Sequence, residues 1–141
     1  EDIFARSLSQ KAVWMIAKNL GNTSLGARHG IGYLLGSIGS VPHGHTSCVM
    51  LPAVLKWNES FNKEKQKWIA NALGRPKLSA SDAVAELISD LGLPRTLSDV
   101  GIRNDQWDKI AEYGVKHPTV LSNPRPITKK SDIIEILKLA S

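Results

Sequence analysis

Cysteine is nearly absent from this chain, since Cys48 is the only one among 141 residues. One thiol cannot form an internal disulfide, and such scarcity is typical of a reducing compartment, which leads us to expect a cytoplasmic protein. Long apolar runs are missing too, because none approaches the roughly 20 residues that a membrane-spanning helix requires. No secretory signal opens the sequence. These absences argue against a disulfide-stabilised secreted protein and against a membrane protein.

Aromatic residues are also few, at 6% of the sequence, and they do not alternate with the basic ones as stacking platforms for nucleic acid would. The net charge is +5, but the densest basic stretch, NKEKQKW at 62–68, is interrupted by Glu64 and is typical of a solvated helix face. We therefore expect no nucleic-acid partner. Hydrophobic residues at 42% and charged residues at 22% are ordinary for one globular domain, which we place at 1–141.

Strand signals are scarce, because apolar and polar residues nowhere alternate cleanly between turns. Apolar residues recur instead at helical spacing in the segments 2–20, 25–38, 43–57, 63–74, 79–92, 103–117 and 132–140. Pro52 should kink or restart the helix that begins at His43, and the proline-rich segment 118–128 should form an extended connection. Trp14, Trp68 and Trp107 lie on apolar helical faces and are expected in the core. The sequence thus predicts an all-α helical bundle.

The stretch RHGIGYLLGSIGSVPHGH, residues 28–45, holds most of the histidines. His29 and Tyr33 are four residues apart and project from one side of a helix. Glycines and Pro42 then break the chain, and His43 begins the next helix, so the turn can bring the two imidazoles side by side. Imidazoles that converge from two helices commonly hold a divalent transition metal. The alternative is that each imidazole only hydrogen-bonds a carbonyl in a packed interior.

Several short motifs resemble the histidine region of the iron-containing alcohol dehydrogenases. The segment NPRPI at 123–127 is more specifically similar to the tail of the maleylacetate reductases in that superfamily. The family pattern is roughly H-G-x-x-H-x-L-G, then P-H-G, then L-P-x-V-x-x-x-N. The matching residues here are His29-Gly30, Leu35-Gly36, Pro42-His43-Gly44, Leu51-Pro52, Val54 and Asn58.

The resemblance implies a fold, cofactors and a reaction. The chain would be the helical C-terminal domain of an oxidoreductase that uses NAD(P) and a divalent metal, iron or zinc, on a small carbonyl or enone substrate. His29 and His43 match two of the family's metal ligands, whereas its aspartate and histidine on an earlier helix have no counterpart. The second family histidine, four residues after the first, is Tyr33 here. The nucleotide-binding α/β domain is expected outside these residues.

By this resemblance the catalytic candidates are His29, Tyr33, His43 and His45, with His29 and His43 as candidate metal ligands. The substrate-binding candidates are Arg125 and Asn123: Arg125, held between two prolines, would pair with a substrate carboxylate, and Asn123 would orient that segment. A surface arginine in a proline-rich segment is the alternative.

We expect a small-molecule substrate, and either a homo-oligomer or association with a chain that supplies the missing domain. Two other functions stay open. One is non-redox acid–base chemistry on a small metabolite, by an isomerase, dehydratase or cyclase. The other is a non-catalytic remnant.

Overall fold

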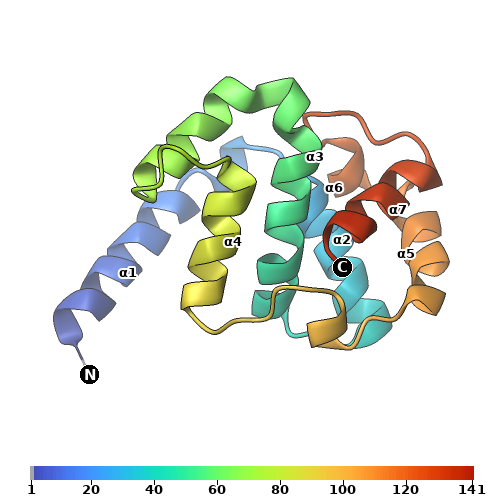
Figure 1. Cartoon of the computed structure of the whole chain (residues 1–141), viewed down its shortest axis with the longest axis horizontal. Coiled ribbons are helices and arrows are strands. Elements are labelled where there is room, and N and C mark those ends of the chain that lie inside the picture. The colour runs from blue at the N-terminus through green and yellow to red at the C-terminus, as the bar shows by residue number, and fades with distance from the viewer. Residues whose placement is uncertain (1) are drawn as a thin grey trace.

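The computed structural model describes residues 2–141, and its elements are helices without a strand among those residues (Figure 1). The α-helices are α1 (Ile3–Ala17), α2 (Ala27–Gly39), α3 (His43–Ala72), α4 (Ala80–Asp90), α5 (Trp107–Gly114), α6 (Pro118–Leu121) and α7 (Lys130–Leu139). Short 3-10 turns η1 (Leu20–Asn22), η2 (Ser98–Val100) and η3 (Asn104–Gln106) lie between them. The predicted all-α fold is confirmed.

The core lies where α2, α3, α5 and α7 meet, with α3 in the middle of the molecule (Figure 1). Each helix contributes side chains that are fully withdrawn from water: Ile31 and Leu35 from α2, Val49 and Met50 from α3, Ile110 from α5, and Ile133, Ile136 and Leu137 from α7. Burying one such side chain stabilises the fold by about 1.5–3 kcal/mol. This core holds α2 and α3, which carry the predicted histidines, in a defined relative position.

The turn between α2 and α3 has a conformation that its residues dictate. Ser40 caps α2 in the left-handed region, with φ of 54°, and the Val41 N–H donates to the Leu35 carbonyl oxygen at 3.4 Å, as in a Schellman cap. A Cβ at Gly39 would collide with Ile102 Cδ1, so a larger residue at this helix end would force the Ile102 side chain to move. The chain then enters α3 at His43 immediately after Pro42, whose fixed φ suits that position.

The break in α3 is not where the sequence predicted it. The helix continues through Pro52, and the non-helical residue is Asn62, with φ −138° and ψ 31°. Gln66 stabilises this distortion because its Nε2 donates to the Leu55 carbonyl oxygen at 2.9 Å and to Asn62 Oδ1 at 2.8 Å. Pro52 removes only one backbone donor, and α4 packs alongside, with Ser81 Oγ donating to the Pro52 carbonyl oxygen at 2.9 Å.

The expectation for two tryptophans was wrong. Trp14 is 63% exposed and Trp68 is 76% exposed. Trp107, the third tryptophan expected in the core, is partly buried and packs against it, and Trp57 is buried. No residue of α1 is buried, although the helix carries Phe4, Leu8 and Met15 on one face. Helical spacing shows that a face is apolar, but it does not show which element, if any, covers it.

The segment 118–128 is partly helical, which corrects the expectation of an extended connection. It opens with α6, and His117 caps this short helix, since its Nδ1 accepts a hydrogen bond from the Thr119 N–H at 3.2 Å. Pro118 occupies the first helical position, where a missing N–H costs nothing. Among residues 2–141 we find no helix with the length and apolar character needed to cross a membrane.

Candidate functional site

Tyr33 brings the predicted histidines together. Its ring stacks on His43, with ring centroids 5.9 Å apart and planes 16° apart, and contacts His29 at 6.2 Å between centroids. His29 and Tyr33 lie one turn apart on α2, and His43 is the first residue of α3. Tyr33 is 43% exposed, so a small molecule can reach the group from solvent. We name these three residues together with His117 the imidazole cluster.

His117 is the member of this cluster that the sequence did not reveal. Its ring lies 6.1 Å from Tyr33 between centroids, although 84 positions separate the two residues in the chain (117 − 33). The close packing of α6 on α2 makes this contact, because Gly30 leaves room for Val120 and His117. No spacing rule connects such distant residues, so only the tertiary structure could identify His117.

The electrostatic surroundings favour a neutral imidazole at His29. Partial burial lowers the pKa of His29 from its usual value, and the neighbouring Arg28 and His43 lower it further. A neutral imidazole has one ring N–H to donate and one ring nitrogen to accept. His29 is therefore suited to hydrogen-bonding a substrate oxygen at neutral pH.

The described residues do not fit the metal site that the family resemblance implies. Zinc sites generally use three or four protein ligands. Across residues 2–141 no group of three or more His, Cys, Asp or Glu side chains is arranged to hold a metal ion. His29 and His43 would supply two ligands only, because the family's aspartate and histidine on an earlier helix have no counterpart among residues 2–141. We derive no chemical step through a metal for this chain.

His45 lies apart from His43 although only Gly44 separates them in the sequence. Both belong to the first turn of α3, and side chains at i and i+2 on a helix point to different sides. His45 is half-buried, whereas His43 is exposed and stacks on Tyr33. The structure thus brings His29, Tyr33 and His43 together and leaves His45 on another side of α3.

Asn123 is buried and serves as a connector between three elements. Its Oδ1 accepts from the Ala27 N–H at 3.2 Å, at the start of α2. Its Nδ2 donates to Asn58 Oδ1 and to the Arg125 carbonyl oxygen, both at 2.7 Å. Asn123 therefore orients the segment around Arg125, as the sequence suggested. Its amide is used by the protein itself.

Arg125 is likewise engaged by the protein. Its guanidinium lies 3.6 Å from the centre of the Trp57 ring, and Nη1 donates to the Trp57 carbonyl oxygen at 2.8 Å. Trp57 lies about 20 Å from His43 along the axis of α3, because an α-helix rises roughly 1.5 Å per residue. The structure therefore does not bring Arg125 to the imidazole cluster.

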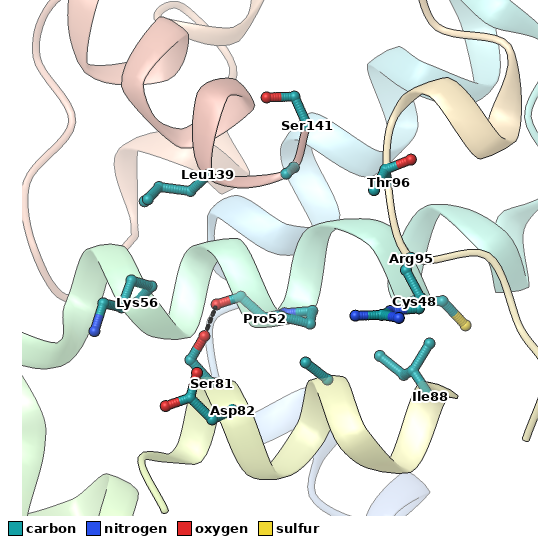
Figure 2. Close-up of a pocket in the computed structure, with 12 residues that line it drawn as sticks. Cys48, Pro52, Lys56, Ser81, Asp82, Ile88, Arg95, Thr96, Leu139 and Ser141 are labelled. Atoms are coloured by element: carbon teal, nitrogen blue, oxygen red, sulfur yellow. Dashed lines mark hydrogen bonds between the residues drawn. The ribbon is translucent and has the colours of Figure 1, made fainter. Parts of the chain in front are cut away.

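A separate cavity of about 330 Å³ lies between α3, α4 and the C-terminal end of α7 (Figure 2). Cys48, Pro52 and Lys56, one turn apart along α3, form one wall, and Ser81 and Asp82 form the α4 side. In Figure 2, Arg95 reaches from its loop toward Pro52, beside Cys48. None of the sequence-predicted site residues lines this cavity.

Comparison with known proteins agrees with the motifs. Residues 1–141 match the family model for the C-terminal region of the Fe-containing alcohol dehydrogenase family. Dehydrogenase ALT3 of Alternaria alternata is 37% identical over 139 residues, which cover 85% of this chain and 36% of the relative. Maleylacetate reductase of Burkholderia cepacia is 32% identical over 136 residues, which cover 96% of this chain and 37% of the relative.

The solved structures agree in fold. An alcohol dehydrogenase from Oenococcus oeni superposes with a TM-score of 0.76 at 29% identity, covering 85% of this chain and 33% of that one. The chain spans about a third of the length of the relatives it matches. This chain belongs to the iron-containing alcohol dehydrogenase family of oxidoreductases and corresponds to its helical C-terminal domain.

Proposed function

We propose that this chain forms the helical wall of the active site of an NAD(P)-dependent oxidoreductase that acts on a small carbonyl or enone substrate. Two relatives support the substrate class by name, a maleylacetate reductase and a lactaldehyde reductase of Escherichia coli. The observation that carries the proposal is the contact of the Tyr33 ring with both His29 and His43. These side chains form a polar, accessible group of hydrogen-bond donors at the position of the family's histidines.

In the proposed reduction, a nicotinamide cofactor held by residues outside these 141 would supply a hydride to the carbonyl carbon, and the carbonyl oxygen would gain a proton. The neutral His29 donates a hydrogen bond to that oxygen and stabilises the negative charge that develops on it. Tyr33 supplies the proton from its hydroxyl group and regains one from solvent, to which its side chain is open. His43, stacked on Tyr33, holds the phenol ring in place and offers a second donor.

The nicotinamide-binding part is proposed to come from residues outside these 141 or from another chain. The apolar face of α1, with Phe4, Leu8 and Met15 exposed, supports association with such a part or with a second copy. The protein would then have a small-molecule substrate bound between the two parts.

Two matched histidine variants test the proposal. In purified protein that includes the nicotinamide-binding part, with NADH or NADPH and a small carbonyl substrate, His43→Asn should lower kcat about a hundredfold, because a hydrogen-bond donor to the carbonyl oxygen is lost. His45→Asn, two residues away on another side of α3, should leave kcat within about twofold. Equal effects of both variants would contradict the assignment of the site. Turnover of an enone without any nicotinamide would favour the acid–base alternative instead.

A further inference from the structure

Arg28 is a cation at the imidazole cluster, and no carboxylate among residues 2–141 forms an ion pair with it. The Arg28 guanidinium donates one hydrogen bond to a side chain, from Nη1 to Ser47 Oγ at 2.8 Å. The ion pairs found within residues 2–141 involve other basic side chains, and none of them includes Arg28. A guanidinium has five N–H donors, so most of those of Arg28 remain available.

The hydrogen bond to Ser47 places the guanidinium beside the predicted histidines. Arg28 lies in the first turn of α2 and immediately precedes His29. Ser47 lies one turn after His43 on α3, and its Oγ is 3.4 Å from the His43 carbonyl oxygen, to which it donates. Arg28 thus bridges from α2 to α3 alongside the two imidazoles. Its charge is close enough to lower the pKa of His29.

The burial of Arg28 makes the lack of an anion significant. Its side chain is about half-buried, and this burial lowers the pKa of Arg28 from its usual value. Arginine nevertheless stays protonated in proteins, so a positive charge persists in a partly desolvated place. The start of α2 adds the positive end of a helix dipole.

We infer that Arg28 is a specificity-determining residue that binds a carboxylate of the substrate next to the imidazole cluster. This inference rests on the proposed function, because it assigns the substrate of that site to the carboxylated carbonyl compounds. The planar guanidinium matches a carboxylate in a two-bond arrangement. The substrate carbonyl oxygen would then meet His29 and Tyr33, while its carboxylate pairs with Arg28. The sequence predicted this role for Arg125, but the Arg125 guanidinium stacks on the Trp57 ring and donates to the Trp57 carbonyl oxygen.

The test is a binding titration that needs no cofactor. Maleate, its uncharged counterpart maleamide and inorganic phosphate are titrated into the full chain at constant ionic strength, followed by calorimetry and by amide and arginine side-chain NMR signals. Arg28→Gln should raise the dissociation constant of maleate about ten- to hundredfold. Arg28→Lys should raise it less, because the charge stays while the planar fork is lost. Arg95→Gln, at an arginine lining the other cavity, is the matched control and should change nothing.

Several outcomes would overturn the inference. These are unchanged maleate binding in Arg28→Gln, equal binding of maleamide and maleate, or an Arg28-dependent preference for phosphate, which would point to a cofactor phosphate. Circular dichroism establishes that each variant is folded, and if Arg28→Gln does not fold, Arg28→Lys carries the test. Failure of the proposed function is recognised separately. Nicotinamide-dependent turnover is therefore measured in protein that also contains the nicotinamide-binding part. In that protein, maleate binding that depends on Arg28 without any turnover supports the inference and refutes the redox assignment.

Discussion

Replacing Gly30 with alanine should destabilise the protein and disturb the imidazole cluster. A Cβ built at this position lies 2.5 Å from Val120 Cγ2, 3.0 Å from the Val120 backbone nitrogen and 3.3 Å from His117 Nδ1. Carbon atoms in contact are about 3.5–4.0 Å apart, so α6 must move from α2 by roughly 1 Å. Val120 is fully buried and cannot turn aside into solvent. The movement would therefore carry His117 away from Tyr33.

The size of the effect follows from two opposing terms. Overpacking a core typically costs about 1–3 kcal/mol. Alanine in place of glycine inside a helix returns about 1 kcal/mol, because glycine is the poorer helix former. We expect a net loss of up to about 2 kcal/mol in the free energy of unfolding. Gly44→Ala is the matched control, since a Cβ at Gly44 meets nothing within 4 Å and α3 should gain about 0.5–1 kcal/mol.

Urea and thermal unfolding followed by circular dichroism would measure both variants. For a domain of this size, each kcal/mol corresponds to a shift in Tm of roughly 3–5 °C. Gly30→Ala should therefore melt several degrees below Gly44→Ala, with the NMR signals of Tyr33 and His117 displaced. Equal stabilisation by the two alanines would refute the reasoning, because it would mean that α6 does not approach α2 as closely as the structure has it.

Other variants test further parts of the fold. Asn123→Ala should lower the free energy of unfolding by about 2–4 kcal/mol in urea titrations, because the buried Asn58 amide loses its partner. Hydrogen bonds from the backbone N–H groups of Arg95 and Thr96 lower the pKa of Asp99. Its stabilising contribution is present at neutral pH and lost as the pH falls through that lowered pKa, so Asp99→Asn should weaken the protein at pH 7 and make little difference under strongly acidic conditions. Trp14→Gln should leave Tm within about 2 °C, because this indole is exposed. A large loss in Trp14→Gln would mean that α1 is covered in solution.

Much of the fold was predictable because helix formation is a local property. The spacing of apolar residues identified α2, α4, α5 and α7 to within a few residues. The glycines and Pro42 of the 36–42 segment predicted the turn that ends α2 and begins α3 at His43. These features depend on residues within one or two turns of each other, so the sequence carries them directly.

Predictions about the environment of a residue were less successful, because they depend on what packs nearby. Pro52 carried the stronger local signal for a helix break, yet α3 bends at Asn62, where Gln66 satisfies the Leu55 carbonyl oxygen. Trp14 and Trp68 have apolar neighbours in their helices but no covering element among residues 2–141. Periodicity identifies an apolar face, and only the packing of helices decides whether that face is buried.

The residues of the candidate site also fall into those that the sequence predicted and those that only the tertiary structure revealed. The sequence alone paired His29 with Tyr33, because i and i+4 share a helix face, and placed His43 after the turn. Only the tertiary structure added His117, because α6 packs on α2 over Gly30. It also placed Arg125 on Trp57 and Arg28 at Ser47 beside His43. Local chemistry determines what each side chain can do, and the packing of distant helices determines which side chains meet.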